Sequence, residues 1–150
     1  MGANVPEQGS VRLGPVSEFP IHTPVEVRFR DLDPLGHVNN AVYLTYAELG
    51  RMHYIRAMGA DEAGGNFILA RAEVDFLRPV HLGESLEVRT RVPRVGNSSF
   101  HTLSEIWAEG HLAARVSAVV VWLEEGRPAR IPEHIRAAVR RLETLPVEGV

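Results

Sequence analysis

The sequence predicts an α+β fold in which an antiparallel sheet wraps around one long helix. The first observation is a helical pattern over residues 41–58 that is apolar on several sides, so this helix needs a cover. The second is a set of four later segments that alternate apolar and polar residues, as strands with one buried face do. The third is the short turn sequences between these segments, which favour antiparallel neighbours.

The chain of 150 residues has a length suited to one domain with its own core. Residues 1–20 carry Gly, Pro, Ser and Glu without periodicity, which predicts a flexible N-terminal arm. Residues 21–145 should then form a single domain. Its first strand is predicted at residues 25–30, where apolar and polar residues alternate.

The long helix is expected from Ala41 to about Met58. Asn39 or Asn40 can serve as its N-cap, and Gly59 stands where a C-cap glycine belongs. Its first turns leave little polar surface, so we expect burial on several sides. The apolar residues of these turns are Val42, Tyr43, Leu44, Tyr46, Ala47 and Leu49.

Four strands should follow the helix, and a short helix beginning at Pro132 should end the domain. The predicted strands are residues 68–76, 86–92, 100–108 and 113–123. The residues expected to share one face of the first of them are Ile68, Ala70, Ala72, Val74 and Phe76. The outer face and edges of such a sheet need cover, so we expect a homodimer or homotetramer. A cone-shaped sheet of the cystatin or nuclear-transport-factor type is the alternative architecture.

Composition excludes several classes of function. The formal net charge of −3 argues against a nucleic-acid partner. Cysteine is absent, which excludes disulfides, thiolate catalysis and Cys-ligated zinc. The longest apolar run, residues 118–123, is too short to span a membrane, and the first residues lack a secretory pattern. We therefore expect a cytoplasmic protein, and the histidine spacing predicts no metal site.

Residues 30–40, Arg-Asp-Leu-Asp-Pro-Leu-Gly-His-Val-Asn-Asn, contain the candidate chemistry. They place two carboxylates, a histidine and two asparagines on a turn that opens the long helix. A helix start offers free backbone N–H groups and a partial positive charge. A carboxylate beside such an end can attack a carbonyl whose developing oxyanion the N–H groups hold. This arrangement suits acyl transfer.

Together with Tyr43, Tyr46 and Glu48, this segment resembles the hotdog-fold acyl-CoA thioesterases of the 4-hydroxybenzoyl-CoA thioesterase type. It also resembles the plant acyl-carrier-protein thioesterases, although Leu35 stands where the plant pattern has an asparagine. The weaker matches are residues 76–80, 96–100 and 130–133. The resemblance implies a hotdog fold and hydrolysis of acyl- or aroyl-CoA thioesters to free acid and CoA. It also implies a pantetheine channel between two subunits, a tetramer built as a dimer of hotdog dimers, and no cofactor, since the CoA thioester is the substrate.

The resemblance also implies roles for single residues. The acid aligned with Asp33 acts on the thioester as nucleophile or general base. The backbone N–H of the residue aligned with Asn40 binds the carbonyl oxygen. In the plant enzymes the histidine aligned with His37 belongs to the catalytic set.

Each of these residues also has a structural interpretation. Asp-Pro-x-Gly is a good turn sequence, so Asp33 could simply hold local N–H groups. Asp31 is expected to be structural. His37 could be a core histidine, and Asn39 and Asn40 could be helix caps.

Glu48 is the alternative catalytic carboxylate, because some hotdog thioesterases use a Glu on this helix. A buried Glu needs a partner, which Arg51 or a Tyr hydroxyl could supply. Arg94, with Ser98 and Ser99, is a candidate for binding the phosphates or pantetheine of CoA, because guanidinium groups suit phosphate. The alternative is that Arg94, with Arg89 and Arg91, forms a solvated surface.

Two further functions stay open at this point. Hotdog enoyl-CoA hydratases also pair Asp and His, in an Asp-x-Asn-Pro-Leu-His setting, but residues 33–37 are one residue tighter and lack that Asn. The other is a non-catalytic acyl-CoA-binding protein. Hotdog regulators of that kind carry a DNA-binding helical domain, for which the first 20 residues are too short.

Overall fold

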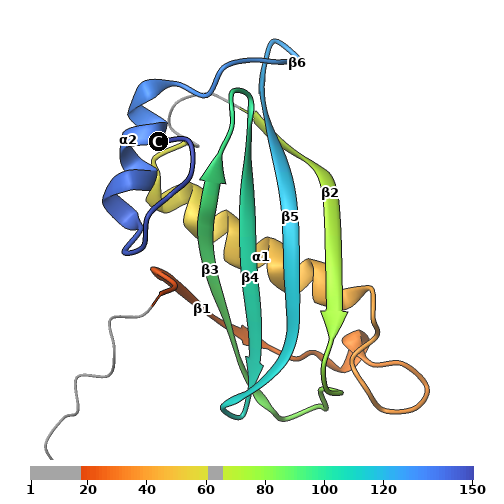
Figure 1. Cartoon of the computed structure of the whole chain (residues 1–150). Helices are drawn as coiled ribbons and strands as arrows, with labels where there is room; N and C mark the ends of the chain where they lie inside the picture. The colour runs from red at the N-terminus through yellow and green to blue at the C-terminus, as the bar shows by residue number, and fades with distance from the viewer. Residues whose placement is uncertain (1–17, 61–65) are drawn as a thin grey trace, which may run out of the picture.

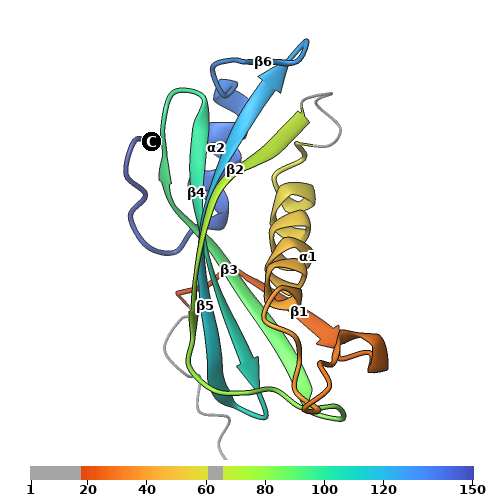
Figure 2. The same ribbon diagram turned by 90° about the vertical axis from the view of Figure 1, so that its right-hand side faces the viewer.

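One sheet and one long helix dominate the computed structural model, which describes residues 18–60 and 66–150. Among these residues, six strands form an antiparallel sheet in the order β1-β3-β4-β5-β2, with β6 paired to β5. Helix α1 crosses one face of the sheet (Figures 1 and 2). The predicted α+β arrangement is confirmed. Most of the predicted arm, residues 1–17, lies outside the described residues.

The elements match most of the predicted ranges to within a few residues. The strands are β1 (Ile21–Glu26), β2 (Asn66–Phe76), β3 (Ser85–Val95), β4 (Ser99–Ala108), β5 (His111–Glu124) and the short β6 (Arg127–Pro128). The helices are α1 (Val42–Ala57), α2 (Glu133–Leu142) and the 3-10 turn η1 (Phe29–Asp31). Gly59 follows α1 with a φ of +72°, the left-handed conformation that ends many helices.

The first strand lies earlier than predicted. Residues 25–30 do not extend as one strand, because the Asp31 side chain accepts hydrogen bonds from the backbone and side chain of Arg28 and bends the chain into η1. Phe29 is consequently 81% exposed instead of facing the core. β1 pairs with β3 over its whole length.

A β-bulge splits β2 between Leu69 and Arg71, where the pairing with β5 shifts by one residue. The shift reverses which side chains face α1. Ile68 therefore lies on the opposite face from Phe76, which corrects the prediction of one shared face. On the helix side of the sheet, Phe67 packs edge to face against two core aromatic rings.

Helix α1 approaches β3 closely at Gly50. A Cβ atom at this position would lie 2.5 Å from Thr90 Oγ1 and 2.7 Å from Val88 Cγ1. The absence of a side chain at Gly50 thus allows the helix to approach β3 closely. The helix also turns Tyr46 and Tyr54 toward the sheet, and both are almost fully buried.

The other sides of α1 are open within the chain. Leu44 is 38% exposed and Leu49 is 47% exposed. The predicted burial on several sides is therefore wrong for the single chain. No helix of the described residues combines the length and apolar character that crossing a membrane requires.

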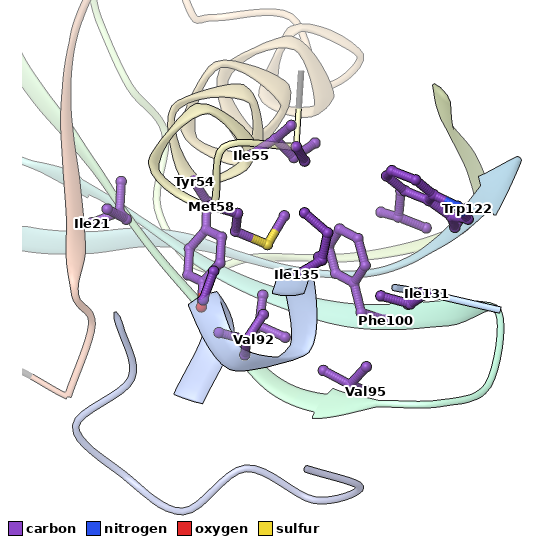
Figure 3. Close-up of a cluster of buried hydrophobic side chains, with 14 residues drawn as sticks. Ile21, Tyr54, Ile55, Met58, Val92, Val95, Phe100, Trp122, Ile131 and Ile135 are labelled. Carbon is purple, nitrogen blue, oxygen red and sulfur yellow. The ribbon is translucent and has the colours of Figure 1, made fainter. Parts of the chain in front are cut away.

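Helix α2 completes the core at the C-terminal end of α1. Tyr54 of α1 and Met58, the C-cap of that helix, meet Ile135 of α2 and Val92 of β3 in one cluster (Figure 3). The cluster buries aromatic and branched side chains from both helices and from strands β1, β3, β4 and β5, and this burial stabilises this end of the fold.

The C-terminal tail continues the sheet edge beyond the end of β1. The Val95 N–H donates to the Glu148 carbonyl at 2.9 Å, and the Glu148 N–H donates to the Pro93 carbonyl at 3.0 Å. Arg136 is 6% exposed and binds the tail to the β3–β4 turn. Its guanidinium donates to the carbonyls of Ile131, Gly149, Gly96 and Asn97.

Replacing Gly50 with Ala is expected to destabilise the protein by about 1–3 kcal/mol, because the added Cβ overlaps β3 side chains. The sign of the change in unfolding free energy distinguishes a close contact from an exposed site, since Gly to Ala in an exposed helix stabilises by roughly 1 kcal/mol. Urea unfolding followed by circular dichroism measures the change. Thr45→Ala, at an exposed position of α1, is the matched control and should be nearly neutral. A stabilised Gly50→Ala variant would contradict the close approach.

Candidate active site

A tight hairpin between Leu32 and Val38 positions Asp33. The Asp33 N–H donates to the His37 carbonyl at 2.7 Å, and the Gly36 N–H donates to the Asp33 carbonyl at 3.1 Å. Gly36 has a φ of +85°, which glycine adopts without steric strain. The predicted Asp-Pro-x-Gly turn is confirmed.

The two oxygens of the Asp33 carboxylate have different surroundings. Oδ1 accepts the N–H of Leu35 at 2.9 Å and that of His37 at 3.1 Å. Within residues 18–60 and 66–150, Oδ2 has no hydrogen bond or ion pair. One oxygen therefore fixes the orientation of the group, and the other is available to a ligand.

Asn39 and Asn40 lie in the turn that precedes α1. Ala41 is the N-cap, so neither asparagine occupies that position as predicted. Asn39 instead closes a turn before the helix, where its Oδ1 accepts the Ala41 N–H at 2.9 Å and its carbonyl accepts the Val42 N–H at 2.9 Å. The Asn40 N–H meets no acceptor in the described part of the chain.

Asp33, His37 and Asn40 line one pocket of about 290 Å³, near the N-terminal end of α1. The structure thus brings these three predicted residues together. The remaining lining residues are Val38, Tyr43, Phe76, Leu77, Arg78 and Pro79. The pocket therefore combines a carboxylate, an imidazole and a cation with apolar side chains.

Sequence patterns did not single out Arg78 and His81. Arg78 lines the pocket, and its Nη2 lies 3.5 Å from Glu84 Oε1. The His81 ring lies edge-on to the His37 ring, with centroids 5.0 Å apart. The same Glu84 oxygen is 3.8 Å from His81 Nδ1. The sequence feature that could have identified Arg78 is its position at the end of a strand, directly before a proline.

Asp31 supports the site from behind and is only 2% exposed. Its Oδ2 accepts the Arg28 N–H at 3.0 Å and the Tyr46 hydroxyl at 2.8 Å, and Arg28 Nη2 donates to Oδ1 at 2.9 Å. Burial acts to raise the pKa of Asp31, but the hydrogen bonds from Arg28 and Tyr46 outweigh it, so the pKa lies below its usual value. Burial and the bond to Asp31 raise the pKa of Tyr46. This agrees with the structural role expected for Asp31.

Glu48 lies outside the Asp33 pocket. It is exposed, which corrects the prediction of a buried carboxylate, and it lines a second pocket of about 190 Å³ between α1 and β2. Among the residues that the structure describes, its carboxylate forms no hydrogen bond or ion pair with Arg51 or with a Tyr hydroxyl.

The candidate CoA-binding residues lie far from Asp33 in the same chain. Arg94, Ser98 and Ser99 sit at the β3–β4 turn, at the opposite end of the sheet from the loop that carries Asp33 (Figure 1). The Arg94 Nε lies 3.7 Å from Glu148 Oε1, and the Arg94 side chain is largely exposed. In the described ranges, no cluster of three or more His, Asp or Glu side chains could hold a metal ion.

Known proteins share this sequence pattern. A family profile described as the Thioesterase-like superfamily matches residues 27–139. The chloroplastic acyl-acyl carrier protein thioesterase ATL2 of Arabidopsis thaliana is 30% identical over 140 residues, which cover 87% of this chain and 71% of ATL2. The acyl-CoA thioester hydrolase YbgC of Escherichia coli is 26% identical over 128 residues, covering 79% of this chain and 94% of YbgC.

A solved structure extends the likeness to the whole fold. It is a thioesterase of Thermus thermophilus complexed with coenzyme A and Zn, with 48% sequence identity and a TM-score of 0.83. The alignment covers 88% of this chain and 100% of the Thermus chain.

Replacing Asp31 with Asn is expected to lower the free energy of unfolding by about 1–3 kcal/mol near neutral pH, because charge-assisted hydrogen bonds are weakened. The pKa of Asp31 is lower in the folded protein, so its stabilisation is present above the unfolded value of about 3.9 and is lost as the pH falls through the folded value.

Urea unfolding of both proteins, from neutral pH down to about pH 2, checks this expectation. The stability difference should shrink below about pH 4. Asp75→Asn, at an exposed position of β2, is the control and should show no such convergence. A difference that stays constant with pH would exclude the charged network as its source.

Proposed function

Because this chain belongs to the thioesterase-like superfamily and has the hotdog fold, we propose that it hydrolyses acyl- or aroyl-CoA thioesters to free acid and CoA. That it is a thioester hydrolase follows from the family. The CoA part of the proposal is supported by relatives named as acyl-CoA thioester hydrolases and by the CoA complex of the Thermus thioesterase.

One observation carries the proposed mechanism: Asp33, whose Oδ2 has no partner among the described residues, and Asn40, whose N–H has none there, line the same pocket. Asp33 attacks the thioester carbonyl carbon, or it takes a proton from a water that attacks it. The Asn40 N–H and the positive end of α1 stabilise the oxyanion that forms. Collapse of the tetrahedral intermediate breaks the C–S bond and releases the CoA thiolate.

His37 acts on Asp33 and on the reacting atoms. Its backbone N–H holds Asp33 Oδ1 at 3.1 Å, and its side chain lines the same pocket. The imidazole can orient the attacking water or donate a hydrogen bond to the leaving sulfur. A CoA thiolate is a good leaving group, so His37 contributes to turnover without being indispensable.

We propose that CoA binds through its phosphates or pantetheine to Arg94, Ser98 and Ser99. These residues lie at the far end of the sheet from Asp33, so one substrate would join residues of two subunits. β2 is an edge strand, and apolar side chains on it and on α1 are exposed, which supports a homodimer or a homotetramer.

A cytoplasmic location and the absence of any cofactor complete the proposal. A sequence without cysteine fits a reducing compartment. The proposed chemistry needs only a carboxylate, backbone donors and water, all of which the site can supply without a metal.

Replacing Asp33 with Asn is expected to reduce kcat at least about a hundredfold. Asn keeps an oxygen that can accept the Leu35 and His37 N–H groups, so the hairpin should persist. Free-thiol release from a panel of acyl- and aroyl-CoA esters measures the rate, and loss of enoyl absorbance from crotonyl-CoA tests for hydratase activity. Asp75→Asn is the control. Near-normal hydrolysis by Asp33→Asn would refute the assignment.

Single turnover in isotope-labelled water separates the two roles of Asp33. A nucleophilic carboxylate passes through an anhydride, and label then enters the protein at Asp33. A general base leaves the label only in the released acid.

Replacing Arg94 with Ala is expected to raise the KM for an acyl-CoA about tenfold with little change in kcat, since a phosphate contact is lost in ground state and transition state alike. The same acyl group on N-acetylcysteamine, which lacks the nucleotide, should be hydrolysed as before. Arg56→Ala, at an exposed position of α1, is the control. Equal losses with both substrates would place the effect in folding instead of CoA binding.

A further inference from the structure

A small pocket lies between α1 and β2, apart from the pocket that Asp33 lines. Its volume is about 190 Å³, and the two pockets share no lining residue. Two charged side chains of α1 line it, Glu48 and Arg51. Its other walls are apolar and come from α1, β2 and β5: Met52, Ile55, Phe67, Leu69 and Val120.

The apolar walls of this pocket belong to the folded core. Ile55 and Val120 are members of the buried cluster of Figure 3, and Met52 and Phe67 pack against that cluster. Two core aromatic rings hold the Phe67 ring edge to face, at centroid distances of 4.9 and 4.8 Å. A ligand therefore meets apolar surface that is already in place, which lowers the cost of binding.

Arg51 is a deeply placed cation without an anionic partner. It is only 9% exposed, yet within residues 18–60 and 66–150 its guanidinium forms no hydrogen bond or ion pair. Burial lowers its pKa, and the charge of Glu48 opposes this effect only in part. A buried cation is unfavourable unless an opposite charge pairs with it. The pocket therefore contains a charge that favours an anion.

A molecule in the pocket can reach the guanidinium of Arg51. In the part of the chain that the structure describes, the fully buried side-chain polar atoms without a partner are Arg91 Nε, Trp107 Nε1 and Glu143 Oε2. The unpaired nitrogens of Arg51 are not among them, so they keep accessible surface. Because Arg51 lines the pocket, a ligand that enters the pocket can bind this surface.

We propose that this pocket, which we call the Arg51 site, binds a carboxylate that carries a short apolar tail. The carboxylate pairs with the guanidinium of Arg51, whose planar fork matches two carboxylate oxygens. The tail lies against Met52, Phe67 and Leu69. Pockets for drug-sized ligands measure roughly 300–1,000 Å³, so a site of about 190 Å³ takes a smaller molecule.

Two kinds of molecule carry this chemistry. One is a free acid with an apolar tail, which is also what hydrolysis of an acyl thioester releases. The other is an acyl-CoA whose acyl group ends in a second carboxylate. The second source rests on the proposed function, whereas binding of a free acid does not.

Glu48 weakens the Arg51 site. Its carboxylate is near enough to act on the charge of Arg51, so it also repels a bound carboxylate. Glu48 is exposed and has no partner among the described residues, so its charge can be removed without loss of a native contact. The two neighbouring charges therefore have opposite effects on a carboxylate ligand.

Hexanoate is the probe for this site, and the methyl group of Met52 reports its binding. In protein labelled with ¹³C at the methionine methyl groups, hexanoate should shift the Met52 signal in a saturable way. Met58, which is buried in the core, is the internal reference, and Met52→Leu assigns the signal. Acetate lacks the tail and hexanol lacks the charge, so each should bind at least about tenfold more weakly.

Variants of the two charged residues test the contact. Arg51→Gln should weaken hexanoate binding at least about tenfold, because charge-assisted hydrogen bonds are lost. Glu48→Gln should tighten binding about threefold. Arg56→Gln, at an exposed position of α1 outside the pocket, is the control and should bind like the parent. Urea unfolding checks that Arg51→Gln folds, as expected when an unpaired buried cation is removed.

Turnover distinguishes the two sources of the carboxylate. Adipoyl-CoA and hexanoyl-CoA differ only at the far end of the acyl group, where the first has a carboxylate. If the carboxylate arrives on the acyl group, Arg51→Gln lowers kcat/KM for adipoyl-CoA at least about tenfold and leaves hexanoyl-CoA unchanged. If it arrives as a free acid, Arg51→Gln changes neither rate and loses only hexanoate binding.

Three outcomes overturn the Arg51 site: no saturable shift of Met52, equal binding of hexanoate and hexanol, or parent-like binding of hexanoate by Arg51→Gln. In each case Arg51 simply keeps its head group in water. If Arg51→Gln does not fold, Glu48→Gln decides, and unchanged or weaker binding by that variant overturns the site. A parent protein that binds hexanoate but hydrolyses no thioester leaves the site standing and refutes the proposed function instead.

Discussion

The buried carboxylate of Asp31 is the constraint on which the rest of the site depends. Its two carboxylate oxygens accept hydrogen bonds from the N–H and guanidinium of Arg28 and from the hydroxyl of Tyr46. The backbone carbonyl of Asp31 accepts the Asn39 N–H at 2.8 Å. The end of β1, the turn before α1 and the second turn of α1 therefore meet at one residue. A carboxylate this deeply buried must have all its acceptors filled, so these three segments have little freedom to shift separately. The Asp33 hairpin and the free N–H of Asn40 lie between them and take their relative position from this network.

The same network shows where sequence patterns succeed and where they fail. Helix α1 and strands β2 to β5 were predicted because the period of apolar residues in a long segment indicates both the type of element and its buried face. The meeting of Asp33 and Asn40 in one pocket was predictable because they are close in sequence. β1 was placed too late in the chain because the bonds between Arg28 and Asp31 convert an alternating stretch into a turn. Arg78 was missed because it reaches the pocket only through the long-range pairing of the sheet.

The structure differs from the sequence prediction at two further places, because a hydrophobic pattern alone does not determine which way a side chain points or what covers it. Alternation along β2 is continuous in the sequence, but one extra residue after Leu69 turns Ile68 to the other face. A pattern also cannot tell burial inside one chain from burial between chains. Leu44 and Leu49 were predicted to be buried, and they are exposed on the single chain. The surface of the single chain leaves these two apolar side chains of α1 uncovered.

Residues 148 and 149 complete a sheet edge whose strand, β3, is synthesised much earlier. The backbone of Glu148 completes the edge of β3 at Pro93 and Val95, and Arg136 binds a carbonyl at Gly149. A chain emerging from the ribosome presents β3 long before residues 148 and 149 exist. That edge therefore stays open to other strands until residues 148 and 149 have been made and fold back onto it. For expression and fusion work, residues 148 and 149 are part of the sheet edge and cannot be replaced by an arbitrary linker without opening it.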